Sequence, residues 1–269
     1  MSKIYKALKK AEKEKKDSIQ IMEIEKFISK EPIKEEKPSE IDDLVIAWKD
    51  PESEVAEQFR KLCMKILTNF SDKKVILITS ALPLEGKTVV TANLGVCFAQ
   101  LPESYVLLID ADLRKPSLHK LLGMQEKKGL SEYLQKKVKI SEIFYKTLIP
   151  KLSLIPAGKR TKSPAELLSS SLMRNLVAEV KNRYPDRYIF IDSTPILLTS
   201  EPDILVKQVD GIILVVQYGK TPKNSLERAL LSLPREKILG IVFNRVDFKL
   251  LKYKYSYSYY RSKDKKKKI

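Results

Sequence analysis

The segment at residues 80–88 has the residue types that bind phosphate, and it joins an apolar run to a helical stretch at 89–99. It reads Ser-Ala-Leu-Pro-Leu-Glu-Gly-Lys-Thr. In such a loop, backbone N–H groups and the amino end of the following helix face an anion. Lys87 would neutralise the β and γ oxygens of a nucleotide, and the Thr88 hydroxyl could ligate Mg²⁺. The segment departs from the strict phosphate-loop pattern, because Ala81 stands where the first glycine is expected.

Three carboxylates follow two apolar runs further along the chain. Asp110 and Asp112 stand at the end of the run at 105–110, and Asp192 ends the run at 188–192. Because ligands bind at the carboxyl ends of parallel strands, these side chains are expected to lie beside the phosphate-binding loop. One aspartate alone would suit a helix cap. Three beside a Gly-Lys-Thr loop favour oxygen ligands for Mg²⁺ and phosphoryl transfer.

The elements that must position these residues alternate between short apolar runs and helical stretches. Fully apolar strands separated by helices predict a parallel sheet that is covered on both faces. The expected fold class is therefore α/β, a doubly wound and mostly parallel sheet with helices on both faces, and the loop at 80–88 makes it a P-loop NTPase. The runs lie at 75–80, 105–110, 152–156, 188–192, 211–216 and 238–243.

Composition and periodicity divide the chain into four parts. Apolar residues recur at helical spacing at the start, a charged stretch with two prolines follows, and a lysine- and tyrosine-rich stretch comes last. Within the third part, a helix is predicted at 54–69 with one apolar face made of Val55, Phe59, Leu62 and Ile66. The four parts are a short amphipathic helix at 1–16, a charged linker at 17–50, a P-loop domain at 51–248 and a basic tyrosine-rich tail at 249–269.

The charge of the chain is unevenly distributed. The formal net charge is +17, and the tail from Lys249 to Ile269 supplies nine Lys or Arg against the single Asp264. Such a tail can attract nucleic acid, an acidic membrane or an acidic protein, and it can equally be a solvated extension. Charge alone does not choose among these partners.

The two cysteines and the longest apolar runs bear on the compartment. Cys63 and Cys97 lack the spacing of a metal site or a disulfide framework, which indicates a reducing, cytoplasmic compartment. Apolar runs such as 212–216 are far shorter than the roughly 18 residues of a membrane span. The segment 1–16 lacks the apolar centre of a signal peptide. Any role at a membrane is therefore expected to come through a partner.

With these residues in place, the chain resembles the bacterial tyrosine kinases of polysaccharide export and chain-length control, in the branch of cytoplasmic autokinases. The resemblance covers residues 54–247 and makes 51–248 a P-loop kinase domain. It is carried by the loop described above and most of all by the run Val-Leu-Leu-Ile-Asp-Ala-Asp-Leu-Arg-Lys-Pro-Ser-Leu-His-Lys-Leu-Leu-Gly at 106–123. Three further segments, at 164–170, 188–195 and 240–245, are also similar to family segments.

The resemblance implies a role for the residues of these motifs. Lys87 would hold the phosphates of ATP as a catalytic residue. Asp110 would accept the proton of an incoming tyrosine hydroxyl, which is sensible chemistry for a phenol with a pKa of about 10. Arg114 would neutralise charge or organise the acceptor, with a surface salt bridge as the alternative. The implied ATP-binding residues are Pro83, Leu84, Glu85, Gly86, Lys87, Thr88 and Val89, and the implied Mg²⁺ site is Thr88 with Asp112 and Asp192.

The tail carries a cluster of tyrosines with alternating spacing. In the resembled kinases a C-terminal tyrosine cluster is phosphorylated in trans, one subunit acting on the tail of the next, so the resemblance also implies self-association. A β-strand with an aromatic face is the structural alternative for such a run. The implied phosphoacceptors are Tyr253, Tyr255, Tyr257, Tyr259 and Tyr260.

The function that the resemblance implies is an ATP- and Mg²⁺-dependent protein-tyrosine autokinase that regulates capsule or exopolysaccharide synthesis and export. Its implied partners are a membrane-bound activator or adaptor protein of a polysaccharide export system and a cognate tyrosine phosphatase. Recruitment by the activator would bring the cytoplasmic protein to the inner face of the membrane. No nucleic-acid partner is expected, because the sequence has no helix-turn-helix signal and no RNA-type aromatic motif.

Three places depart from the family pattern. Leu84 stands where the family loop has glycine, so ATP binding would weaken if the backbone there requires a positive φ. In the oligomerisation helix of the family a second arginine follows, but here Glu57 and Arg60 are followed by Cys63. The run Ser-Thr-Pro at 193–195 replaces a typical Thr-Pro-Pro.

Two other functions remain open from the sequence. A partition or division-site ATPase shares the sheet and several motifs, but such proteins carry an extra lysine early in the loop, where Leu82 stands here. An ATP-binding scaffold without kinase activity would follow if Leu84 disables the loop. The missing lysine and the tyrosine-rich tail favour the kinase.

Overall fold

The computed structural model describes residues 40–183 and 186–247 of the chain. The helix predicted at 1–16, most of the predicted linker and the tyrosine-rich tail lie outside the described residues.

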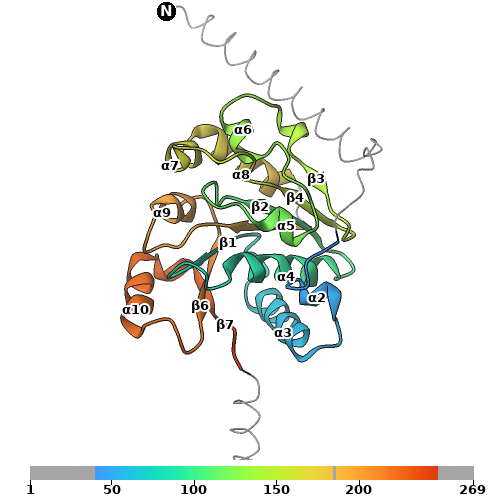
Figure 1. Cartoon of the computed structure of the whole chain (residues 1–269), viewed down its shortest axis with the longest axis vertical. Coiled ribbons are helices and arrows are strands. Elements are labelled where there is room, and N and C mark those ends of the chain that lie inside the picture. Colours follow the sequence, from blue (N-terminus) through green and yellow to red (C-terminus); the bar gives the residue numbers. More distant parts are fainter. Residues whose placement is uncertain (1–39, 184–185, 248–269) are drawn as a thin grey trace, which may run out of the picture.

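Seven strands form one sheet in the order β3-β4-β2-β5-β1-β6-β7 (Figure 1). All neighbouring strands are parallel except β3 and β4. Strands are added on both sides of β1, which confirms the predicted doubly wound, mostly parallel α/β fold. The strands are β1 (Val75–Ser80), β2 (Tyr105–Asp110), β3 (Tyr145–Lys146), β4 (Leu152–Ile155), β5 (Arg187–Asp192), β6 (Gly211–Gln217) and β7 (Ile238–Asn244).

Helices cover both faces of the sheet because its central strands bury side chains on both sides. In β1, Val75 and Leu77 pack into one core, and Ile76 and Ile78 pack into the other. The first core is covered by α6 (Leu130–Leu134), α7 (Pro164–Leu168), α8 (Ser171–Arg183), α9 (Glu201–Val206) and α10 (Lys223–Ser232), and the second by α2 (Ile46–Lys49), α3 (Glu54–Asn69), α4 (Lys87–Ala99) and α5 (Leu118–Leu121). Two short 3₁₀ turns, η1 (Ile140–Glu142) and η2 (Arg235–Lys237), complete the described elements. Within the described ranges, no helix has the length and apolar composition that crossing a bilayer requires.

The predicted runs match the observed strands closely. The runs at 75–80 and 105–110 coincide with β1 and β2, and the other four differ from the observed strands by one residue at an end. The sequence did not reveal β3, which has two residues and pairs antiparallel with β4. A strand of that length is too short to show a period of two.

The structure differs from the predicted linker at its end. In the segment 40–50, Ile41, Val45 and Ala47 are buried against the second core. The buried amide of Asn93 in α4 also ties this segment down, since it accepts from Ala47 N at 2.9 Å and donates to Leu44 O at 2.8 Å. Residues 41–49 therefore belong to the folded domain. Their few apolar side chains were too short a set to show a helical period in the sequence.

Helix α3 has the predicted bounds, but its apolar face is covered only in part. Its first turn is capped by the Ser53 hydroxyl, which accepts from Ala56 N at 3.1 Å. Ile66 is buried, whereas Val55 at the amino end of the predicted face is 39% exposed. This face borders β7, at one end of the strand order.

Candidate active site

The phosphate-binding loop follows β1, and α4 begins at its Lys87. Gly86 caps this helix with a φ of 90°, a left-handed conformation that glycine adopts without strain. A Cβ atom at Gly86 would lie 2.0 Å from Asn244 Nδ2. Both the conformation and the close approach of Asn244 therefore require glycine here, and the amino end of α4 is free to face a phosphate.

Leu84 also has a left-handed backbone, with a φ of 63°. The sequence predicts weaker ATP binding if the backbone at this position has a positive φ, and the structure has that positive φ. A side chain in this region costs about 1–2 kcal/mol. The Leu84 side chain is 84% exposed, so packing contributes little to offset that strain.

The side chains of Glu85 and Asn244 hold the loop in place, a role that the sequence did not predict for either of them. The Glu85 carboxylate is buried, accepts from Leu82 N at 2.7 Å and is hydrogen-bonded by the Thr221 hydroxyl. The Asn244 amide at the end of β7 donates to Glu85 O at 2.8 Å. Asn244 lies in one of the family-like segments, but nothing in the sequence indicated the side-chain role of Glu85. The loop is thus fastened to the ends of both β6 and β7.

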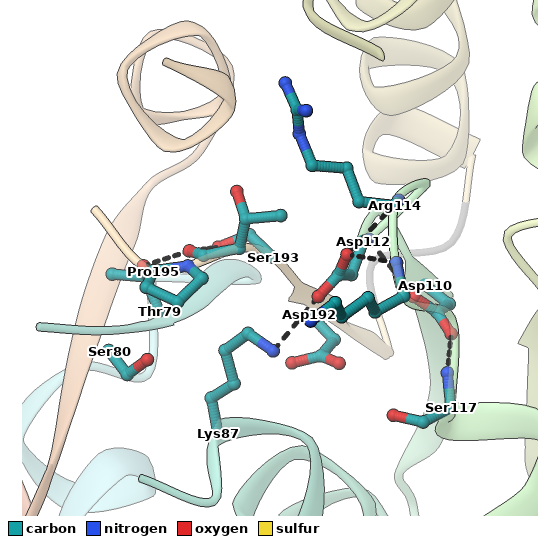
Figure 2. Close-up of polar contacts among 12 residues, drawn as sticks. Thr79, Ser80, Lys87, Asp110, Asp112, Arg114, Ser117, Asp192, Ser193 and Pro195 are labelled. Atoms are coloured by element: carbon teal, nitrogen blue, oxygen red, sulfur yellow. Dashed lines mark hydrogen bonds and ion pairs between the residues drawn. The ribbon is translucent and has the colours of Figure 1, made fainter. Parts of the chain in front are cut away.

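The three aspartates and Lys87 meet at the carboxyl ends of the central strands. Asp110 and Asp192 are direct neighbours in the register of β2 and β5. Lys87 Nζ reaches Asp112 Oδ2 at 3.2 Å, and Figure 2 shows Asp192 beside this pair. Thr88 follows Lys87 in the first turn of α4, and the Thr91 hydroxyl donates to Asp192 Oδ1 at 3.4 Å. The structure therefore brings together the phosphate-binding and carboxylate residues that the sequence singled out.

Burial sets the electrostatics of this cluster. It raises the pKa of Asp192 to about 6, although the charge of Lys87 opposes the shift. Burial also raises the pKa of Asp110 well above its ordinary value, and the neighbouring Asp192 adds to the effect. For Lys87, burial alone would lower the pKa, but Asp192 and Asp112 together raise it. Lys87 therefore stays charged and partly compensates the buried carboxylates.

Asp110 is enclosed by backbone donors. Its Oδ1 accepts from Asp112 N at 3.1 Å, and its Oδ2 accepts from Ser117 N at 3.3 Å and from Leu118 N at 3.1 Å. The side chain is fully buried, and Figure 2 shows its contact with Ser117. To take a proton from a substrate, Asp110 must release one of these contacts.

The residues present fit a phosphate-bound Mg²⁺ better than a metal held by protein alone. Among the residues that the structure describes, no group of three or more His, Cys, Asp or Glu side chains could hold a metal ion. Asp192 Oδ2 is buried and has no hydrogen-bond partner within the described part. Mg²⁺ in nucleotide sites keeps several waters and takes only one or two protein ligands, so one free carboxylate oxygen and the Thr88 hydroxyl suit it.

The Arg114 side chain points away from Lys87 (Figure 2). It pairs with Glu201 at the start of α9. Arg114 Nε lies 2.7 Å from Glu201 Oε1, and Glu201 is fully buried. The salt bridge considered for Arg114 therefore exists, although its carboxylate partner is buried. The sequence contained no signal for Glu201.

The family-like helix motif in α3 keeps its first two residues. Arg60 pairs with Glu57 at 2.8 Å, whereas Cys63 at the third position is buried. The five predicted phosphoacceptor tyrosines lie outside the described residues.

Comparisons with known proteins agree with this site. A family model described as an AAA domain matches residues 73–232. The tyrosine-protein kinase YwqD of Bacillus subtilis (strain 168) is 39% identical over 204 residues, which are 74% of this chain and 85% of YwqD. The succinoglycan biosynthesis transport protein ExoP of Rhizobium meliloti (strain 1021) is 34% identical over 209 residues, 73% of this chain and 26% of ExoP. The solved structure of the chimerical protein CapA2B2 has a TM-score of 0.71 and 27% identity, and the match covers 78% of this chain and 93% of that one. On its phosphate-binding loop, its strand-end carboxylates and these similarities, the chain belongs to the bacterial tyrosine-protein kinases.

Proposed function

We propose that this kinase phosphorylates its own C-terminal tyrosine cluster in trans, with Mg-ATP as donor, and thereby regulates polysaccharide synthesis and export. The observation that carries the proposal is a kinase chain whose own sequence has five tyrosines within the eight residues 253–260. The cluster begins six residues after Asp247, where the described fold ends.

ATP would lie on the loop at 83–89 and the amino end of α4. There Lys87 holds the β and γ phosphates, and backbone N–H groups of the loop bind their oxygens. Thr88 would ligate Mg²⁺ directly, and Asp112 and Asp192 would hold its waters. Bound Mg²⁺ neutralises phosphate charge as the phosphoryl group moves. To serve in this way Asp112 must exchange its contact with Lys87 for the metal's water.

Asp110 would act as the base for the acceptor. It takes the proton of a tyrosine hydroxyl as the phenolic oxygen bonds to the γ phosphorus, and the bond from that phosphorus to the β–γ bridging oxygen breaks to release ADP. The raised pKa of Asp110 makes its carboxylate a better proton acceptor than an exposed aspartate. Arg114, held by Glu201, would act at the mouth of the site on the acceptor or on developing charge.

For the first tyrosine of the cluster, the geometry of the sheet supports transfer between subunits. The tail leaves from β7, and Asp110 ends β2, four strands away in the sheet order. Four strand spacings are about 19 Å. Tyr253 is six residues beyond Asp247, a reach of at most about 21 Å, so it would need a nearly extended chain to enter its own site. The site of a second copy imposes no such limit.

A membrane-bound activator and a cognate phosphatase complete the proposal. Its support is ExoP, which is named as a polysaccharide biosynthesis transport protein and in which the matched segment is about a quarter of the whole. In ExoP a kinase-like segment is therefore joined to a much longer polypeptide. For this chain we infer that a separate export protein supplies the corresponding contact and recruits the kinase to the inner face of the membrane.

The test is incubation of the full chain with Mg-ATP, with and without the cytoplasmic segment of a candidate activator, followed by mass spectrometry that maps phosphotyrosine over the whole chain. Signal on residues 253–260 that is lost in Lys87→Met supports the proposal. Undiminished phosphotyrosine in a variant with all five tail tyrosines changed to phenylalanine would contradict the tail as substrate. Absence of phosphotyrosine under every condition would favour an ATP-binding scaffold.

A further inference from the structure

An apolar groove of about 330 Å³ runs between α3 and β7. Three of its apolar lining residues come from the predicted apolar face of α3, and three more come from the end of β7 and the residues that follow. Gln58, Asn244 and Arg245 add polar groups to the lining. The apolar lining residues are Val55, Phe59, Leu62, Val242, Phe243 and Val246.

The groove is not filled by the described residues. Phe243 is 55% exposed, and its ring meets the Tyr218 ring edge-on, at a centroid distance of 6.5 Å. Val55, at the other wall, is also exposed. Exposed apolar surface of this kind gains about 25 cal/mol for each Å² that an apolar partner covers. An occupant should therefore be sought.

The chain itself supplies an apolar segment at this place. Val246 lines the groove, and the described fold ends one residue later. The next four residues are Phe248, Lys249, Leu250 and Leu251, three of them large and apolar. Phe248 is two residues from Val246, within about 7 Å of chain, so the segment starts within reach of the groove.

We propose that residues 248–251 dock into the α3–β7 groove of their own chain and anchor the tail there. The match is one of chemistry, because apolar side chains meet an apolar groove and Lys249 reaches solvent. The connectivity of the chain also matches, because Val246 lines the groove and the segment 248–251 begins two residues after it. This docking does not depend on the kinase reaction.

Docking has a consequence that does rest on the proposed function. With Leu251 held at β7, Tyr253 and Tyr255 are two and four residues from the anchor and reach at most about 14 Å. That is short of the about 19 Å between the ends of β7 and β2. The anchor would therefore keep these two tyrosines out of their own active site and leave them available to a neighbouring subunit.

Cross-linking within the full chain tests the docking without any activity measurement. Gln58 is exposed and lines the groove, so Gln58→Cys with Lys249→Cys places two thiols together and leaves the apolar tail residues intact. A short bismaleimide would join them. The native Cys63 and Cys97 are buried, which raises their pKa to about 12 and about 11 and keeps them unreactive near neutral pH. The control pair is Leu231→Cys with Lys249→Cys, because Leu231 lies on α10 and is exposed.

We expect the groove pair to give at least fivefold more intramolecular cross-link than the control pair, read by intact mass and peptide mapping. Either Phe243→Ser in the groove or Phe248→Ser in the tail should reduce it at least threefold, whereas Leu231→Ser should not. Equal cross-linking of the two pairs would overturn the proposal. Cross-linked dimers in place of monomers would also overturn it, because the occupant would then be the tail of a second copy.

Discussion

Leu84 is the residue at which this phosphate-binding loop departs most clearly from what its backbone prefers. Glycine at this position removes about 1–2 kcal/mol of left-handed backbone strain from the folded state. It also raises the conformational entropy of the unfolded chain, which destabilises the folded state by about 0.4–1 kcal/mol. Because the side chain is exposed, little packing is lost. We predict that Leu84→Gly raises the free energy of unfolding by up to about 1 kcal/mol, and that β-branched Leu84→Val lowers it. Urea denaturation measures both.

A second left-handed residue provides the control for the loop. Lys136 has a φ of 60° and an exposed side chain, and it lies after α6, away from the loop. Lys136→Gly should gain stability in the same way without changing the affinity for a fluorescent ATP analogue. Leu84→Gly should at least retain that affinity. A loss of stability in Leu84→Gly would show that the left-handed backbone is not strained.

Asp192 makes stability depend on pH in an unusual direction. Its pKa is raised to about 6 by burial, so between about pH 4 and pH 6 the folded state binds more protons than the unfolded state. Its contribution to stability is complete below the unfolded pKa and is lost as pH rises through about 6. A shift of about two units corresponds to about 3 kcal/mol at most. We predict that Asp192→Asn gains about 1–3 kcal/mol over the unmodified chain at pH 8 and much less at pH 4.5, by urea denaturation, while it loses kinase activity.

Asp210 gives a control of opposite sign. Burial alone would raise its pKa, but the Lys181 ammonium and backbone N–H groups lower it. Its contribution is therefore present above the unfolded pKa and lost on acidification. Asp210→Asn should destabilise the protein more at pH 8 than at pH 4.5. If Asp192→Asn behaved like Asp210→Asn, the buried carboxylate would be stabilised by its neighbours and the pKa argument would be wrong.

At the scale of elements, the sequence predicted those that are fully buried and repetitive. Runs such as 75–80 and 105–110 became strands because their side chains are buried on both faces, which leaves an uninterrupted apolar signal. β3 and the packed segment at 41–49 left no such signal. Each depends on contacts with another element, β3 with β4 and the segment 41–49 with Asn93 of α4.

The same distinction separates the predicted from the missed site residues. Asp110 and Asp192 were predictable because the carboxyl ends of parallel strands converge wherever the strands are correctly identified. The Arg114–Glu201 pair joins residues 87 apart in sequence, and Glu85 meets Thr221 across 136. Such pairs follow from the packing of loops, which local pattern does not encode.

Strand β7 contributes to the site by holding the loop through Asn244. Asn244→Ala removes the hydrogen bond to Glu85 O and opens the space above Gly86. One hydrogen bond contributes about 1 kcal/mol, so we predict about fivefold weaker binding of Mg-ATP. Asn224→Ala on the exposed face of α10 is the control and should bind normally. Unchanged affinity in Asn244→Ala, measured with a fluorescent analogue, would mean that Glu85 and Thr221 hold the loop without β7.

At the scale of the whole molecule, the position of the active site and the exit of the tail lie apart on one sheet. The carboxylates end β2 and β5 near the middle of the strand order, whereas the chain leaves the described fold at β7, the last strand. A sheet covered by helices on both faces does not bend to bring these points together. The distance is therefore a fixed property of the fold, and for Tyr253, at the start of the cluster, it favours the site of another copy.

Mixing two chains, one without the phosphate-binding lysine and one without the tail tyrosines, tests transfer between copies directly. Lys87→Met retains the tail but lacks the phosphate-binding lysine, and the chain with all five tail tyrosines changed to phenylalanine retains the site but lacks acceptors. Neither should form tail phosphotyrosine alone. We predict that the mixture with Mg-ATP phosphorylates the tail of the Lys87→Met chain. At concentrations below the dissociation constant of the two chains, a twofold dilution of both should lower the initial rate about fourfold, since two molecules must meet. Transfer within one chain would give two different results. The fraction of unmodified chain phosphorylated per minute would not change on dilution, and the mixture of the two variants would give no phosphotyrosine. That outcome would require the tail to cross the carboxyl edge of its own sheet, and if Tyr253 or Tyr255 carried the phosphate it would exclude an anchor at β7 during the reaction.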